Sequence, residues 1–154
     1  LHEWNDQYGL NVQGIVADVS TPEGREILRK EVEDRFGGKL DILVNNAGGP
    51  PAGSHDTISD EQWQQAFELT VRSAGRLMDL VLPAMTQKSW GRIVNISSFS
   101  VKQPMPNMML SNSLRLSTIG WAKSLATELG PHNILVNTVC PGWTETQRVS
   151  SLLE

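Results

Sequence analysis

The composition of this 154-residue chain is that of an ordinary globular protein, and 39% hydrophobic residues suffice for one sizeable core. We expect a single domain over 1–154. A formal net charge of −4 provides no basic face for a nucleic acid, and no apolar run reaches the ~18 residues of a membrane span. The single cysteine, Cys140, cannot form an internal disulfide, which favours the cytoplasm, and its apolar neighbours predict a core thiol. The three histidines lie far apart, so no metal site is predicted.

The first elements in chain order are the tail of a helix, a strand and a second helix. Residues 1–8 are typical of a helix tail that Gly9 ends. Residues 12–19 predict a short strand whose end carries Asp18. The helix expected over 22–36 has Thr21 as its N-cap and Pro22 in its first turn. A strand followed by a helix is the unit of a βα repeat.

The run 40–44 carries the clearest strand signal of the chain. Four of its five residues are apolar, which is too continuous for a strand with one solvated face and predicts a parallel strand covered on both sides. The turn that follows consists of Asn45, Asn46, Ala47, Gly48 and Gly49. Amides can donate and accept there, and small residues let a flat ligand approach the backbone. Ligands in open α/β sheets bind at such strand ends, although a plain glycine turn is the alternative interpretation.

Two later runs, 91–98 and 133–142, repeat this pattern of β-rich residues followed by small polar residues or Pro-Gly. Helices are expected between them, over 60–86 and over about 110–130. Ser59 and Gln62 have the spacing of a capping box at the start of the first of these helices. Strands that alternate with helices predict a doubly wound parallel sheet of the α/β class.

Four motifs at the strand ends resemble the short-chain dehydrogenase/reductase family, in order and spacing, over nearly the whole chain. They are Asp18-Val19, Asn45-Asn46-Ala47-Gly48, Ile96-Ser97-Ser98 and Pro141-Gly142-Trp143-Thr144-Glu145-Thr146. The resemblance is to the β-ketoacyl-carrier-protein-reductase-like branch. It implies a Rossmann-type three-layer α/β/α fold, NAD or NADP as cofactor, and a small carbonyl or alcohol substrate. The cofactor contacts that it implies are Asp18, Val19, Asn46, Ala47, Gly48, Arg115, Pro141, Gly142, Trp143, Thr144 and Thr146.

Three of the four catalytic positions of that family carry other residues here. Ser98 matches the serine that polarises the carbonyl, but Ser111, thirteen residues later, replaces the family's tyrosine. Arg115 replaces its lysine, and Thr70 replaces the asparagine that anchors a water relay. An aliphatic hydroxyl is a far weaker acid than a phenol, and arginine does not release its proton as lysine can. We expect either an oxidoreductase with an altered site or a catalytically inactive nucleotide-binding or structural subunit.

Each of these residues also has a purely structural interpretation. Ser98 could satisfy a strand end, and Ser111 with its neighbours could cap a helix. Arg115 could be an ordinary exposed helix residue. Asp18 could interact with a helix N-terminus, and Thr146 could cap whatever follows.

A Rossmann domain holds the dinucleotide pyrophosphate with a glycine-rich turn after its first strand, and no such turn is visible here. We therefore expect the chain to start inside the second βα unit, to lack the first βαβ portion, and to lack the last part that shapes the family's substrate pocket after Thr146. This makes it an excerpt of a longer polypeptide, with a naturally shortened fold as the alternative. The residue that selects NAD or NADP would lie in that portion. The helices expected over 60–86 and 110–130 carry apolar residues on more than one face, which predicts pairing into a homodimer or homotetramer.

Overall fold

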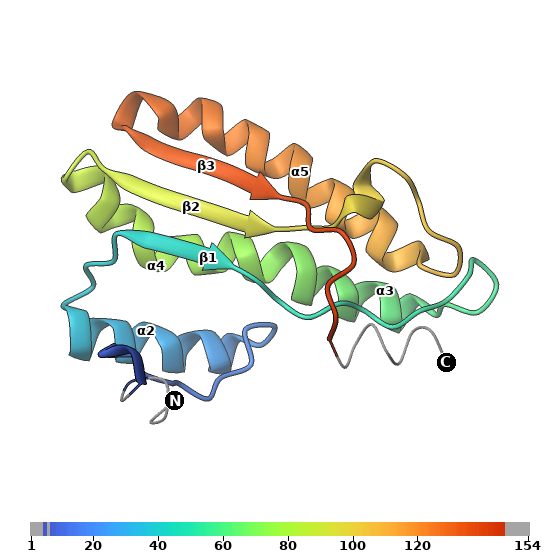
Figure 1. The fold of residues 1–154 in the computed structure, drawn as a ribbon, viewed down its shortest axis with the longest axis horizontal. Helices are drawn as coiled ribbons and strands as arrows, with labels where there is room; N and C mark the ends of the chain where they lie inside the picture. The colour runs from blue at the N-terminus through green and yellow to red at the C-terminus, as the bar shows by residue number, and fades with distance from the viewer. Residues whose placement is uncertain (1–4, 6, 147–154) are drawn as a thin grey trace.

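A computed structural model describes residue 5 and residues 7–146, and its helices and strands alternate along the chain (Figure 1). The predicted α/β class is confirmed: the molecule is a parallel sheet with helices, a fragment of the three-layer Rossmann-type architecture. Its elements are α2 (Pro22–Phe36), β1 (Ile42–Asn45), α3 (Asp60–Phe67), η1 (Glu68–Arg72), α4 (Ser73–Gln87), β2 (Gly91–Ile96), η2 (Phe99–Val101), α5 (Met109–Leu129), η3 (Gly130–His132) and β3 (Ile134–Val139).

The sheet has the order β1-β2-β3, and both neighbouring pairs are parallel. In the register of these pairs Asn45 lies opposite Asn95, and Asn95 lies opposite Thr138. All three strands run in one direction (Figure 1), so their carboxyl ends form a single edge. That edge is where an open α/β sheet binds its ligands.

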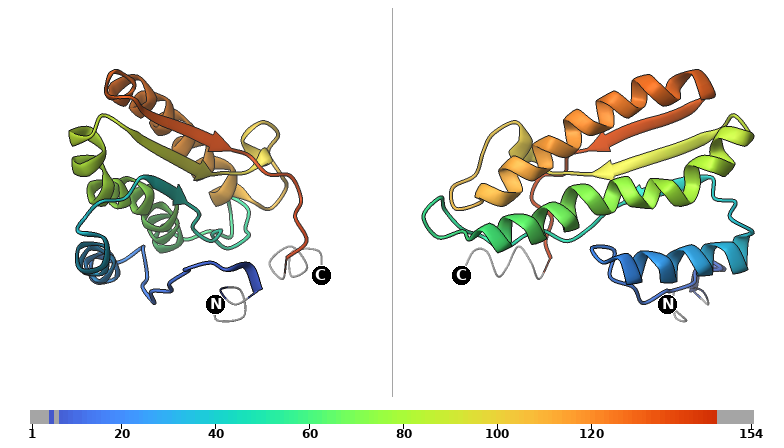
Figure 2. Two further views of the ribbon diagram at one scale, coloured as in Figure 1. Left: turned by 60° about the vertical axis from the view of Figure 1, so that its left-hand side comes forward. Right: turned by 180° about the vertical axis from the view of Figure 1, so that it is seen from behind.

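Helices α4 and α5 cover one face of this sheet (Figure 2), and the main core lies between them and the strands. Its buried members are Met78, Val81, Met85, Ile93 and Ile134. A Cβ added to Gly91 would lie 2.4 Å from the sulfur of Met85, so α4 packs directly on the backbone of β2. The absence of a side chain at this position therefore allows the close approach of helix and strand.

The opposite face of the sheet is open in the described residues. Ile42 and Val44 are 58% and 56% exposed, so the prediction of a strand covered on both faces is not met within the structure. The reason is that α4 and α5 both pack on the other face, and α2 contacts α4. Cys140, directly after β3, is also exposed, and its predicted place in the core is wrong.

The strand predicted over 12–19 is wrong, because residues 10–18 form no strand. A strand needs a neighbour for its backbone groups, and here the segment lies beside α2 instead of a strand (Figures 1 and 2). Arg35 of α2 donates to the side-chain oxygen of Gln13, and the Val16 side chain is 98% exposed. This segment therefore adds no strand to the sheet.

The predicted helix ends agree with the structure. Thr21 caps α2, where its Oγ1 accepts from the Gly24 amide at 3.1 Å. The capping box of α3 is present, with Ser59 and Gln62 bonded in both directions. At the N-terminus the described residues 5, 7 and 8 are helical and Gly9 has a φ of 61°, as expected for a helix end, while residues 1–4 and 6 lie outside the described part.

The helix predicted over 60–86 is divided by η1, a five-residue π-helical segment between α3 and α4. Such widened turns are rare and are frequently found at functional sites. Thr70 lies in this segment and is buried. No helix in the described part of the chain is long and apolar enough to cross a bilayer.

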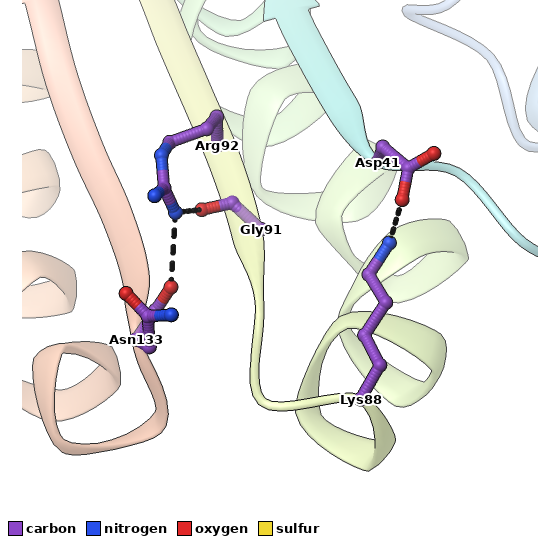
Figure 3. A network of polar contacts seen from close by, with 5 residues as sticks. All are labelled: Asp41, Lys88, Gly91, Arg92 and Asn133. Atoms are coloured by element: carbon purple, nitrogen blue, oxygen red, sulfur yellow. Dashed lines mark hydrogen bonds and ion pairs between the residues drawn. The ribbon is translucent and has the colours of Figure 1, made fainter.

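The amino ends of the strands are joined by a polar network (Figure 3). Lys88 contacts the carboxylate of Asp41, and Arg92 donates to the carbonyls of Gly91 and Asn133 at 2.7 and 3.0 Å. The Arg92 guanidinium also lies 4.4 Å from the centre of the Trp90 ring. These structural contacts occupy the edge opposite the carboxyl ends.

Candidate functional site

A cavity of about 260 Å³, here called the outer cavity, lies at the carboxyl ends of β2 and β3. It brings together the chain segments 97–99, 105–115 and 141–146. Its lining residues are Gly49, Ser97, Ser98, Phe99, Met105, Met108, Ser111, Arg115, Pro141, Gly142, Trp143, Thr144 and Thr146. Three of the four predicted catalytic residues are therefore on one cavity, together with most of the predicted cofactor segment after β3.

Ser98 follows β2 and is the N-cap of η2. Its Oγ accepts from the backbone amide of Ser100 at 3.1 Å, which holds the oxygen in place at the cavity wall. The Ser98 side chain therefore caps η2 and bonds to no backbone group of β2 among the hydrogen bonds of the described residues. Accepting this bond still leaves the hydroxyl proton to be donated to a ligand.

Ser111 and Arg115 lie one turn apart on α5 and both line the outer cavity. Helix α5 begins at Met109 with Met108 at its N-cap position, so the interpretation of Ser111 as a cap is wrong. The Ser111 side chain is instead buried inside the first turns of the helix, where the packing of α5 on the strand ends has placed it.

Arg115 connects the ends of two strands. Its guanidinium donates to the carbonyl of Ile96 at 3.0 Å and to the carbonyls of Ser97 and Ala47 at 3.5 Å. The interpretation of Arg115 as an ordinary exposed helix residue is therefore wrong. The contacts place a fixed positive charge at the sheet edge.

A second cavity of about 150 Å³, here called the inner cavity, lies between the strand ends and the helices, and Arg115 lines both cavities. It also receives three of the predicted cofactor residues: Val19, Asn46 and Ala47. Its full lining is Val19, Val44, Asn45, Asn46, Ala47, Thr70, Ser73, Ala74, Leu77, Asn95, Ile96, Arg115 and Thr118.

Two buried asparagines face each other in the inner cavity. Asn45 Nδ2 donates to Asn95 Oδ1 at 2.9 Å, and the two residues are 7% and 1% exposed. Within the described residues, Asn45 Oδ1, Asn95 Nδ2 and Thr70 Oγ1 have no hydrogen-bond partner. Burying such groups unpaired costs free energy, so the cavity is suited to a guest with hydrogen-bonding groups.

Thr70 stands apart from the other predicted catalytic residues, because it lines the inner cavity and not the outer one. Arg115 lines both cavities and so lies between Thr70 on one side and Ser98 and Ser111 on the other. Sequence reasoning did not single out Asn95, although an amide in an otherwise apolar strand was the available signal. It also did not single out Phe99, Met105 and Met108, which no motif marks.

The remaining predicted cofactor residues, Asp18 and Gly48, line neither cavity. The Asp18 carboxylate accepts from the hydroxyl and the amide of Ser20 at 2.7 and 2.9 Å, and these bonds lower the pKa of Asp18. Its carbonyl accepts from the Thr21 amide at the start of α2. The Asp18 carboxylate thus bonds to the residue before the N-cap of α2, and its backbone carbonyl contacts the N-cap itself.

Comparison with known proteins agrees with this geometry. The family model for short chain dehydrogenases matches residues 1–154. The 3-oxoacyl-acyl-carrier-protein reductase FabG of Vibrio cholerae is 37% identical over 149 residues, which cover 96% of this chain and 60% of the relative. The corresponding Escherichia coli protein is 35% identical over 150 residues, with the same two coverages.

Two solved structures show the likeness in three dimensions. L-sorbose reductase from Gluconobacter frateurii, complexed with NADPH and L-sorbose, aligns with a TM-score of 0.89 at 33% identity, over 96% of this chain and 56% of that one. A 7α-hydroxysteroid dehydrogenase complexed with NADH aligns with a TM-score of 0.89 at 29% identity, over 99% of this chain and 60% of that one. The chain thus spans little more than half the length of these relatives. On the family match, the relatives and the fold, this chain belongs to the short-chain dehydrogenase family.

Proposed function

We propose that the protein containing this chain is an NAD- or NADP-dependent oxidoreductase that interconverts a carbonyl compound and an alcohol at an altered short-chain site. The observation that carries the proposal is the meeting of Ser98, Ser111 and Arg115 with the 141–146 segment around the outer cavity. Relatives of this fold have been solved with NADPH and NADH, which supports the choice of cofactor.

The residues present fit a nicotinamide nucleotide. Among the described residues that line the two cavities, Arg115 is the one that is charged, and its cation suits the hydroxyls and phosphates of such a ligand. The unpartnered amide atoms of Asn45 and Asn95 can bond to its polar groups. We assign its contacts to Asp18, Val19, Asn46, Ala47, Gly48, Arg115, Pro141, Gly142, Trp143, Thr144 and Thr146. The bound nucleotide would supply or accept the hydride.

The protein's own part is to hold and polarise the substrate carbonyl. We assign to Ser98 a hydrogen bond to the carbonyl oxygen, since its Oγ is fixed by the Ser100 amide. Arg115 places positive charge near that oxygen, which favours the negative charge that develops on it during reduction. Ser111 and Thr70 complete the altered site with hydroxyls on the outer and inner cavities.

A second candidate is a catalytically inactive nucleotide-binding or structural subunit. The observation that favours it is the lack of a phenol and a lysine among the residues that line the two cavities. Tyr8, the single tyrosine of the chain, lies before α2 and is 61% exposed. In this interpretation Arg115 mainly holds the ends of β1 and β2 together through the backbone carbonyls that it contacts.

Turnover and binding measured side by side distinguish the two candidates. The full-length protein is tested for NADH and NADPH oxidation over a panel of ketones, and nucleotide binding is measured by calorimetry. If the protein is an oxidoreductase, we expect it to turn over a ketone, and Ser98→Ala should lower that turnover at least about tenfold while nucleotide affinity stays unchanged. Ser113→Ala, which also removes a serine hydroxyl but lies on α5 outside the lining of both cavities, is the matched control. Nucleotide binding without turnover of any ketone would favour the inactive nucleotide-binding subunit. A protein that neither binds nucleotide nor turns over a ketone would reject the oxidoreductase and leave only the structural subunit.

We also propose a homodimer or homotetramer formed through the α3–α4 segment and α5. Leu116 on α5 is 53% exposed, and such an apolar side chain is suited to an interface between copies. The lone cysteine fits a reducing compartment, and we therefore place the protein in the cytoplasm.

A further inference from the structure

Four apolar residues, here called the apolar wall, line the outer cavity: Phe99, Met105, Met108 and Trp143. Ser98 and the buried Ser111 line it too and carry hydroxyls. Among the described residues that line the cavity, none is acidic and Arg115 is the one that is charged. The apolar wall and the Ser98 hydroxyl that we assign to the substrate carbonyl therefore belong to the same cavity.

The methionine side of this wall is held in place by backbone contacts. The Asn112 side chain accepts from the Met105 amide at 3.2 Å and donates to the Met105 carbonyl at 2.9 Å. The loop before α5 is further pinned to the 50s loop, because Gly53 accepts from the Met109 amide at 3.2 Å. These bonds fix the loop that carries Met105 and Met108, so this part of the cavity is preformed.

The aromatic side of the wall is a contact between the segments that follow β2 and β3. The Phe99 and Trp143 ring centres lie 5.7 Å apart with an interplanar angle of 57°, and the Phe99 amide donates to the Pro141 carbonyl at 3.1 Å. Trp143 is 55% exposed despite this contact. A ligand that covered its ring would remove that apolar surface from water.

From this wall we infer that the substrate is a ketone with an apolar alkyl or aryl group, and not a polyhydroxylated sugar; the inference rests on the proposed function. A sugar would bring several hydroxyls against thioethers and rings that cannot pair with them, and unpaired polar groups disfavour binding. An alkyl or aryl group would instead bury apolar surface. The flexible methionines would adapt to chains of different shape.

The test compares matched substrates and matched variants of the full-length protein. Octanone and acetophenone are the apolar ketones, acetone is the small one, and L-sorbose is the sugar. We expect kcat/KM for octanone to exceed that for L-sorbose by about a hundredfold or more. Met105→Gln together with Met108→Gln keeps the side-chain length and should lower kcat/KM for octanone about tenfold, with little change for acetone. Met109→Gln does not touch the cavity lining and is the control.

A second measurement separates failure of this inference from failure of the proposed function. Octanone binding to the nucleotide-saturated protein is followed by calorimetry, where burial of apolar surface gives a negative heat-capacity change. Weaker octanone binding in the double methionine variant, but not in Met109→Gln, supports the inference even if nothing is turned over. Preference for L-sorbose, or octanone binding unchanged by the double methionine variant, would overturn it while leaving the oxidoreductase proposal intact.

Discussion

Restoring the family's catalytic residues would show whether the site is altered or inactive. The triple change is Thr70→Asn, Ser111→Tyr and Arg115→Lys in the full-length protein. Ser111 and Ser98 line the same cavity of about 260 Å³, so a phenol at position 111 can project toward the proposed carbonyl position. A positioned general acid contributes roughly 10²–10⁴-fold, and we expect carbonyl reduction to rise within that range.

The size of the gain must be set against the cost to folding. Ser111 is only 5% exposed, so the ring must enter the cavity, and overpacking costs ~1–3 kcal/mol of unfolding free energy. Losing the charged hydrogen bond from Arg115 to the Ile96 carbonyl costs about 1.5–3 kcal/mol more. Both losses together take a large share of the ~5–15 kcal/mol that stabilises a typical domain, so folding is verified first by circular dichroism.

The assay follows loss of the reduced nicotinamide absorbance with acetophenone as substrate. Ser98→Ala in the triple background should lower the rate again, because it removes the hydroxyl beside the new phenol. Ser113→Tyr alone is the matched control, since a residue two positions along a helix faces another way. A folded, nucleotide-binding triple variant with no gain would show that the alignment of α5 with the family is wrong, or that the cavity serves another reaction.

Three further predictions concern stability and assembly. Asn95→Leu should lower the free energy of unfolding by about 1–3 kcal/mol in urea titrations, because it leaves Asn45 Nδ2 unpaired. The double variant that also carries Asn45→Leu should recover most of that loss. Equal losses of unfolding free energy in the single and double variants would contradict this account. Gly91→Ala should lower the free energy of unfolding by ~1–3 kcal/mol, because the new Cβ would lie 2.4 Å from the Met85 sulfur. An unchanged melting temperature would refute the close packing of α4 on β2. Sedimentation of the full-length protein at micromolar concentration should show a dimer or tetramer that Leu116→Arg weakens; a wild-type monomer would count against the proposed interface.

Local signals in the sequence were sufficient for the secondary structure of most of the chain. The cap at Thr21 and the capping box of Ser59 and Gln62 act within one helical turn, so they were predicted correctly. The apolar run that became β1 and the β-rich runs that became β2 and β3 carry their own β propensity and were also recognised. The same local reasoning failed at 12–19, because a strand exists only when another strand supplies its hydrogen bonds.

The candidate site shows the same division between local and long-range information. The motifs around Ser98 and Gly142 were visible because their residues are adjacent in the sequence. The pairing of Asn45 with Asn95 was not, since it joins side chains fifty positions apart through the register of β1 and β2. Likewise, only the packing of α5 on the strand ends showed that Arg115 contacts backbone carbonyls and that Ser111 caps nothing.

The sequence by itself therefore determined the α/β class, the helix ends, the three strands and the family motifs, because each depends on neighbours within a few residues. The tertiary structure alone decided that Thr70 lies on a different cavity from Ser98, that two methionines join Phe99 and Trp143 in the apolar wall, and that one face of the sheet is open in the described residues. The physical reason is that burial, cavity shape and hydrogen-bond pairing depend on which distant segments come into contact, and no local pattern specifies this.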